Sequence, residues 1–369
     1  MIYLDNNATT KVLPEVRDEM IKYLTENYGN PSSKYYKLAS DSKNAVEYAR
    51  EKVSELFGCD TDEVIFTSGA SESNNFIIKG IADIQEKNKR HIITSKIEHA
   101  SVLETMKYLE KKGFHVTYLD VTKDGTIDLK QLTDAITQET FLVSVMWVNN
   151  ELGSINDIKS IADICRKKNL FLHVDATQAV GKIDVTMPNG VSFLSMSAHK
   201  IYGPKGVGVA IVKKDQFGLP NRITPLIHGG EQENNYRAGT QCVHNIVGLG
   251  KACEIVLRDF EKNQEILKNH EKFLVGILNR KLKDNIVYNS PCQDLKVPGV
   301  INFQIKGVKN VIFLKKISSQ IAASSGSACS ITHPSYTLKA IGLSDEEIAQ
   351  SIRFSLSPYE DIKELEEIL

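Results

Sequence analysis

The sequence predicts an α/β fold, in which helices cover both faces of a mostly parallel sheet and a smaller α+β region completes the chain. Two observations predict it. Helical stretches alternate with short apolar strands over residues 14–212, and the alternation stops after about Gly250. Strands separated by helices of this length pair in parallel, because a parallel connection needs a crossover, and a buried parallel sheet needs helices on both faces.

Each element follows from its local pattern. Apolar residues at helical spacing predict helices at 14–27, 39–57, 73–88, 101–112, 129–136 and 157–169. Short runs rich in Val, Ile, Leu and Phe predict strands at 63–69, 91–95, 115–120, 142–148, 170–176, 192–198 and 206–212. A long charged helix at 254–283, a strand at 300–305 and a C-terminal helical segment form the smaller region.

The composition is that of an ordinary globular protein. The 369 residues are 41% hydrophobic and 25% charged, which allows a substantial core in one large and one smaller domain. A formal net charge of -1 provides no broad attraction to nucleic acid or to anionic membranes. The first residues do not resemble a signal peptide, and no run approaches the roughly 18 apolar residues that span a bilayer. We expect a cytoplasmic protein without direct nucleic-acid or membrane binding.

Six cysteines, at positions 59, 165, 242, 253, 292 and 329, are too few and too scattered for a disulfide framework. None forms a C-x-x-C pair, and we expect no metal site. Cys165 and Cys253 lie in helical patterns beside apolar neighbours, as small buried side chains do. Cys329 differs, because it follows a run of small residues, Ser324–Ala328, which favours an accessible loop.

Polar residues gather where the predicted strands end. They are Ser68-Gly69, His99, Asn150, Asp175 and Lys200. Ligand sites of such sheets lie at the carboxyl ends of the strands. The segment Ser68–Ser73 also joins a strand to a helix, so its backbone N–H groups would suit a phosphate, although an ordinary helix cap by Ser71 or Ser73 explains it equally simply.

Asp175 and Lys200 together suggest the ligand. Pyridoxal phosphate (PLP) forms a Schiff base with a lysine, and a carboxylate facing the pyridine nitrogen keeps that nitrogen protonated, so that the ring accepts electrons from the substrate. Either residue alone is more often a solvated loop residue. Their joint context favours a PLP site.

A series of motifs runs through nearly the whole chain: YLDNNATT, GNPSS, FTSGASESNN, HIITSKIEHASVLE, VNNELG, HVDATQAVGK, SAHKIYGPKGVG, HGGEQE followed by RAGT, SSGSAC and SIRFSL. In this order they resemble the NifS-like and IscS-like cysteine desulfurases of the class-V PLP-dependent aminotransferase family. The resemblance implies the PLP-dependent transferase fold of type I. It also implies a large PLP-binding domain at 13–255, and a small domain of 1–12 with 256–369 that carries the catalytic cysteine loop.

The resemblance assigns a role to individual residues. Lys200 would bind PLP, Asp175 would face the ring nitrogen, and His99 would stack on the ring and help proton transfer. Gln178 would donate to the 3′-oxygen of PLP, and Asn150 would lie between cofactor and substrate. The positions aligned with phosphate contacts are Ala70, Ser71, Ser197, His199 and, from the other subunit of a homodimer, Thr240.

Two residues would handle the substrate, L-cysteine. Arg353 aligns with the arginine that binds the substrate carboxylate, and a guanidinium matches a carboxylate as a planar fork. Its apolar neighbours Ile352 and Phe354 predict a partly buried strand. The thiolate of Cys329 would attack the substrate sulfur, leaving alanine and a persulfide on the enzyme. Whether the site lowers the pKa of Cys329 or deprotonates it on approach stays open.

The sulfur acceptor stays open too. The loop from Cys329 to Ser335 and the tail after SIRFSL are both short for the family, and in the family the C-terminal region helps dock acceptors. We expect iron–sulfur cluster assembly through a scaffold protein, and tRNA thiolation and DNA phosphorothioation remain alternatives. So do selenocysteine lyase activity and a non-catalytic partner in a sulfur-transfer complex. Trp147 occupies a position where histidine is frequent, and we assign it no catalytic role.

Overall fold

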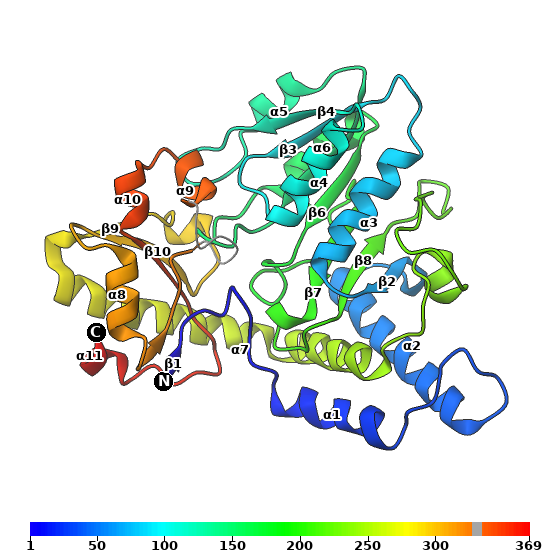
Figure 1. The fold of residues 1–369 in the computed structure, drawn as a ribbon, viewed down its shortest axis with the longest axis horizontal. Coiled ribbons are helices and arrows are strands. Elements are labelled where there is room, and N and C mark those ends of the chain that lie inside the picture. The colour runs from blue at the N-terminus through cyan, green and yellow to red at the C-terminus, as the bar shows by residue number, and fades with distance from the viewer. Residues whose placement is uncertain (327–333) are drawn as a thin grey trace.

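The computed structural model describes residues 1–326 and 334–369 (Figure 1). Its largest element is a seven-stranded sheet with the strand order β2-β8-β7-β6-β5-β3-β4. Only β8 runs antiparallel to its neighbours, so the predicted mostly parallel sheet is confirmed. The strands are β2 (Val64–Thr67), β3 (His91–Ser95), β4 (His115–Leu119), β5 (Thr140–Met146), β6 (Phe171–Asp175), β7 (Phe193–Ser197) and β8 (Gly208–Val212).

Both faces of this sheet are buried. Neighbouring residues of one strand join different hydrophobic clusters: Leu142 packs on one face of β5 and Val143 on the other. One face is covered by α1 (Pro14–Thr25), α2 (Lys37–Phe57), α5 (Leu129–Ala135), α6 (Ile158–Lys167) and the first part of α7 (Val243–Leu282). The other is covered by α3 (Ala70–Asp83) and α4 (Ala100–Glu110). Such strands are mostly apolar because neither face meets water.

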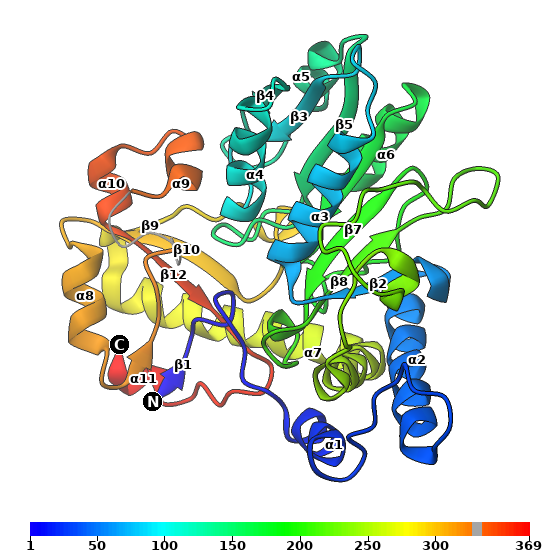
Figure 2. The same cartoon turned by 45° about the vertical axis from the view of Figure 1, so that its right-hand side comes forward.

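A smaller unit with its own core lies beside the sheet (Figure 2). Its antiparallel sheet has the order β12-β10-β9, and β1 pairs with β11. Its strands and helices are β1 (Ile2–Tyr3), β9 (Ile286–Tyr288), β10 (Val300–Ile305), α8 (Asn310–Ile317), β11 (Ile321–Ala322), α9 (Tyr336–Ala340), α10 (Asp345–Ala349), β12 (Ser351–Ser355) and α11 (Leu365–Ile368). Short 3-10 turns complete the chain: η1 (Thr61–Glu63), η2 (Ala198–Lys200), η3 (Gln232–Asn235), η4 (Lys283–Asn285) and η5 (Gln293–Leu295).

Helix α7 joins the two units. It is a single helix of 40 residues that runs along both of them in Figures 1 and 2. Its start differs from the sequence prediction of residue 254, because residues 243–256 are largely apolar and buried and so lack a solvated face. Gly250 packs so closely on α2 that a Cβ there would lie 2.5 Å from the Cβ of Ala49. The predicted domain boundary after residue 255 therefore falls inside a continuous helix.

None of the helices in the described ranges combines the length and the apolarity needed to cross a bilayer. Cys165 and Cys253 are buried, as their helical patterns predict, and burial raises the pKa of each thiol to about 12. Trp147 is a buried side chain of the core under the sheet.

Candidate active site

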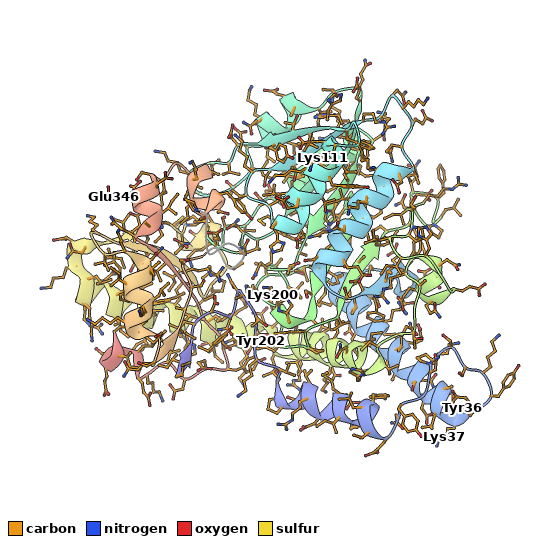
Figure 3. The ribbon with its side chains drawn as sticks, viewed as in Figure 1. Tyr36, Lys37, Lys111, Lys200, Tyr202 and Glu346 are labelled. Carbon is orange, nitrogen blue, oxygen red and sulfur yellow. The ribbon has the colours of Figure 1, made fainter. Side chains whose placement is uncertain are left out.

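The carboxyl ends of β2, β3, β5, β6 and β7 lie at one edge of the large sheet, beside the small unit. Asp175 ends β6, Lys200 ends the turn after β7, and His99 follows β3 as the N-cap of α4. Figure 3 places Lys200 in the middle of the molecule, far from the labelled surface residues Tyr36, Lys111 and Glu346. Because these strands run in parallel, their carboxyl ends bring together His99 and Lys200, which lie 101 positions apart in the chain.

Asp175 is held in one orientation. Its side chain is 5% exposed, its Oδ2 accepts from Asn74 Nδ2 at 2.9 Å, and its Oδ1 accepts from the backbone N–H of Thr177 at 3.0 Å. Asn74 also donates to Ser101 Oγ at 2.9 Å, whereas its own Oδ1 has no partner among the described residues. A buried acceptor left without a donor beside a fixed carboxylate suits a polar ligand at this place.

His99 is prepared to move a proton at Nε2. Its Nδ1 accepts from the backbone N–H of Ser101 at 3.1 Å, so in the neutral ring the proton is on Nε2. Burial lowers the pKa of His99; Asp175 opposes this shift and the charge of Lys200 adds to it. The imidazole is therefore neutral at pH 7.

The N-terminal segment crosses the site at Lys200. The Nζ of Lys200 donates to the backbone oxygens of Asn7 and Ala8 at 2.5 and 2.6 Å. Gln178 Nε2 donates to the same oxygen of Asn7 at 2.9 Å, and Asn7 Nδ2 donates to the backbone oxygen of Asn150 at 2.9 Å. Asn7 thus connects three candidate residues. Sequence reasoning missed it, although it lies within the motif YLDNNATT.

The turn before α3 is open for an anion. Gly69 is the N-cap, and no side chain caps the helix, so the interpretation of Ser71 or Ser73 as a cap is wrong. Ser73 instead shares a hydrogen bond with Thr67 Oγ1 at 2.8 Å. Helix α3 begins at Ala70, three residues before its predicted start, because the positive φ of Gly69 (152°) turns the chain there.

Gly69, Gly208 and Ser197 pack closely together at this turn, and we call this group the cradle. A Cβ on Gly208 would lie 2.6 Å from the Cα of Gly69, and a Cβ on Gly69 would lie 3.5 Å from Ser197 Oγ. The hydroxyl of Ser197 therefore faces the helix N-terminus. Ala70 and Ser71 are the first two residues of α3, so their backbone N–H groups are among those that the helix leaves available to an anion.

The two other predicted phosphate contacts, His199 and Thr240, come from different parts of the chain. His199 Nδ1 shares a hydrogen bond with Thr9 Oγ1 at 3.1 Å, and burial, with a contribution from Lys200, lowers the pKa of His199 to about 4. Thr240 is exposed. Its segment is fixed near α3 by Arg237, whose Nε donates to Glu72 at 3.0 Å.

Arg353 extends from β12 of the small unit towards the large one. It is 1% exposed, more deeply buried than the expected partly buried strand residue. Its guanidinium donates to the backbone oxygens of Asn150 at 2.9 Å and Gly326 at 3.2 Å, and to Asp5 Oδ1 at 2.6 Å. Its Nε has no partner among the described residues. A buried arginine with an unused donor can accept a carboxylate.

The predicted nucleophile, Cys329, lies outside the described residues, but both ends of its segment are described. Ser335 Oγ donates to Glu151 Oε2 at 2.6 Å, and a Cβ on Gly326 would lie 3.0 Å from the same oxygen. Tyr336 donates to the backbone oxygen of Glu98 at 2.8 Å. Glu151 is buried, and burial raises its pKa, opposed by Ser335 and Arg353. This glutamate, which sequence reasoning missed, holds the two ends together.

These groups fit PLP. The set offers a fixed carboxylate, a lysine amine, a neutral imidazole, and an uncapped helix N-terminus with a serine hydroxyl facing it. Asp175, Lys200 and His99 supply the first three, and the cradle around Gly69 supplies the last. Each is a partner that the pyridine nitrogen, the aldehyde, the ring or the phosphate of PLP requires.

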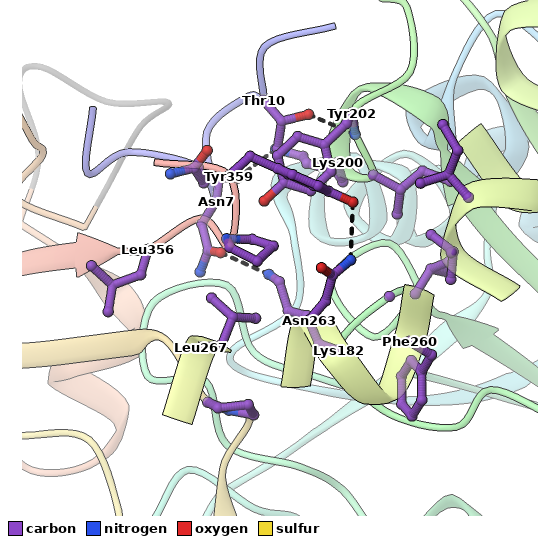
Figure 4. Close-up of a pocket in the computed structure, with 18 of the residues that line it drawn as sticks. Asn7, Thr10, Lys182, Lys200, Tyr202, Phe260, Asn263, Leu267, Leu356 and Tyr359 are labelled. Carbon is purple, nitrogen blue, oxygen red and sulfur yellow. Dashed lines mark hydrogen bonds between the residues drawn. The ribbon is translucent and has the colours of Figure 1, made fainter. Parts of the chain in front are cut away.

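A small cavity opens behind Lys200 (Figure 4). It lies between the N-terminal segment, α7 and the chain after β12. Its polar lining includes Asn7, Lys182 and Lys200, and Figure 4 shows the bond from Lys182 to Asn7. Asp175 and His99 do not line it.

Comparison with known proteins identifies the family. The aminotransferase class-V family model matches residues 2–368. The chain is 42% identical over 375 residues to "Cysteine desulfurase IscS" of Clostridium botulinum, covering 100% of this chain and 93% of that protein.

Two solved structures are similarly close. A "NIFS-LIKE PROTEIN" has a TM-score of 0.91 and 37% identity, covering 100% of this chain and 96% of that one. "SspA in complex with cysteine" has a TM-score of 0.86 and 36% identity, covering 98% of this chain and 100% of that one. These matches span both units and every described site residue. The chain belongs to the class-V aminotransferase family and, within it, to the PLP-dependent cysteine desulfurases.

Proposed function

We propose that this protein removes sulfur from L-cysteine, leaving L-alanine and a persulfide on Cys329. One observation carries the proposal: Asp175, His99 and Lys200 meet at one edge of the sheet, and Arg353 reaches that edge from the small unit. Amine, acid–base and carboxylate-binding groups are what an α-amino acid substrate requires. The relatives named as cysteine desulfurases, and the neighbour solved with cysteine, support this substrate.

The residues of the large unit act on the cofactor. Bound PLP supplies the electron sink that makes the bonds at the substrate α-carbon breakable. Asp175 Oδ1 and Oδ2 keep their orientation through Asn74 and Thr177 and hold a proton on the ring nitrogen. Lys200 provides the amine that carries the cofactor between turnovers. His99 moves a proton at Nε2, because its Nδ1 is occupied by Ser101.

Arg353 and Asn150 orient the substrate. The unused Nε of Arg353 offers a donor to the substrate carboxylate, and Nη1 can exchange its backbone acceptors for that carboxylate, whereas Nη2 is already paired with Asp5. The backbone oxygen of Asn150 accepts from both Arg353 and Asn7, and these two bonds support a position of Asn150 between substrate and cofactor.

The sulfur step balances within the protein and its substrate. The thiolate of Cys329 forms a bond to the substrate sulfur while the carbon–sulfur bond of the substrate breaks. The carbon keeps that electron pair and takes up a proton, which gives alanine. No outside oxidant or reductant is needed, and Cys329 holds the sulfur as a persulfide.

We further propose a cytoplasmic homodimer in which Thr240 reaches the phosphate site of the partner, supported by the exposure of Thr240 next to the Arg237–Glu72 pair. The proposed acceptor is a scaffold protein for iron–sulfur clusters, supported by the IscS relatives. Sedimentation of the purified protein measures its oligomeric state and so tests the proposed dimer. Sulfur labelled on Cys329 and offered to scaffold proteins or to tRNA- and DNA-modifying enzymes tests the acceptor.

The experiment for the reaction itself uses the purified holoprotein. L-Cysteine should yield equal amounts of alanine and protein persulfide, the latter mapped to Cys329 by mass spectrometry. Selenocysteine offered in parallel measures the rival lyase activity. Bound PLP without any alanine from cysteine would contradict the proposal, and a preparation that binds no PLP would support the non-catalytic partner.

A further inference from the structure

The amine of Lys182 lies between two residues of the candidate site. Its Nζ donates to Gln178 Oε1 at 2.6 Å and to Asn7 Oδ1 at 2.7 Å. Figure 4 shows it pointing from the wall of the cavity towards Asn7. Both partners are neutral amide oxygens. Because an ammonium only donates, Lys182 holds the Gln178 amide with Oε1 towards itself and Nε2 away from itself.

The most deeply buried cations in the described part of the chain are paired with carboxylates. Arg50 bonds Glu233 at 2.9 Å, Lys296 bonds Glu271 at 2.6 Å, and Arg353 bonds Asp5 at 2.6 Å. Lys182 is half-buried, and within residues 1–326 and 334–369 no carboxylate forms an ion pair with it. An ammonium that is largely removed from water and has no anion beside it is costly, so proteins seldom keep one without a use.

The surroundings of Lys182 are positive. Burial, together with the charges of Lys200 and Arg353, lowers the pKa of Lys182 to about 7. Three cations thus face a region that takes up two anions under the proposed function, the cofactor and the substrate carboxylate. An anion that enters this region raises the pKa of Lys182 and keeps it charged.

We propose that Lys182 is a positioning residue of the cofactor site, which holds Gln178 and Asn7 in place and carries a positive charge that the bound cofactor balances. This inference rests on the proposed function. Through Gln178 the ammonium orients the amide that meets the ring oxygen of PLP. Through Asn7 it steadies the backbone oxygen that accepts from Lys200.

The test is a pH titration of the absorbance of the bound cofactor. In Lys182→Met, loss of a nearby positive charge makes protonation at the lysine–cofactor linkage easier. We expect its midpoint to rise by about one pH unit, a tenfold gain in proton affinity, and PLP to dissociate about tenfold faster. Lys182→Arg keeps the charge and should stay nearer to the wild type in both measurements. Lys159→Met, an exposed lysine on α6, is the matched control.

The possible outcomes distinguish a failure of the proposed function from a failure of the proposed role of Lys182. A wild-type protein that binds no PLP contradicts the proposed function. A wild type that binds PLP, with Lys182→Met unchanged in midpoint and dissociation, overturns the role of Lys182 alone. If Lys182→Met does not fold, Lys182→Gln replaces it, because glutamine keeps a donor without the charge. Equal effects of Lys182→Arg and Lys182→Met would show that charge is irrelevant and also overturn the inference.

Discussion

The cofactor side and the nucleophile side of the site are built in different ways. Asp175 ends β6 and His99 follows β3, and each is fixed by partners within the large unit. Arg353 and the two ends of the segment that holds Cys329 depend on bonds between distant parts of the chain, such as those to Asn150 and Glu151. A change on the first side should therefore alter the binding or the chemistry of PLP. A change on the second should spare PLP and slow sulfur transfer.

Lys200→Ala should have the largest effect on activity, because it removes both PLP attachment on the cofactor side and sulfur transfer on the nucleophile side. Without this amine we expect no covalent attachment of PLP and no turnover, since no other residue of the segment 195–200 carries an amine. Borohydride reduction followed by peptide mass spectrometry measures the attachment, with Lys159→Ala as control. Attachment at a different lysine together with normal turnover would disprove the assignment.

Cys329→Ser should separate the two sides most cleanly. We expect normal PLP content and a normal spectral change when L-cysteine binds, but no persulfide, because a hydroxyl cannot accept the sulfur. Intact-protein mass spectrometry detects the added sulfur. Cys292→Ser, which removes an exposed cysteine outside the candidate site, should keep full activity. Persulfide on a different cysteine in Cys329→Ser would require another nucleophile.

Asp175→Asn tests the cofactor side alone. The amide can keep a bond to the N–H of Thr177 but loses the charge that keeps the ring nitrogen protonated. We expect kcat to fall by about 100-fold or more, with PLP content little changed. Rates above half of the wild type would contradict the role of Asp175.

Ser335→Ala tests the nucleophile side. The change leaves the buried Glu151 without its 2.6 Å donor, at a cost of about 1–3 kcal/mol. We expect persulfide formation to slow by about tenfold while PLP binding stays the same. Ser344→Ala, which removes the cap of α10, is the control for general damage to the small unit. Equal slowing in both variants would mean that Glu151 does not position the loop ends.

The smallest expected effect is that of Glu98 on the free energy of unfolding and on its dependence on pH. Burial raises the pKa of Glu98 to about 8, and one of its oxygens has no described partner. Between the unfolded pKa near 4.5 and this value, the folded protein binds the extra proton. Its contribution to stability is therefore full below about pH 4.5 and is lost as the pH rises to 8. Urea unfolding should show Glu98→Gln gaining stability relative to the wild type between pH 5 and pH 9, and an unchanged difference would refute it.

The cofactor side could be predicted from sequence because a parallel sheet aligns its strand ends. Once Asp175 and Lys200 are placed after strands, the fold itself brings them together. The contacts of Asn7 and Glu151 could not be predicted, since their partners lie 193 and 184 positions away and no local pattern records them. The serine cap was wrong because glycine at 69 and 208, rather than a hydroxyl, shapes that turn.

Helix α7 has a further consequence for the relative motion of the two units. Forty residues at a rise of about 1.5 Å make a rod about 60 Å long, hydrogen-bonded without interruption beneath both units. A rod of this kind resists hinge bending. Its first part packs in the core under the large sheet and its last part in the core of the small unit. We therefore expect the two units to keep their relative spacing when the substrate enters.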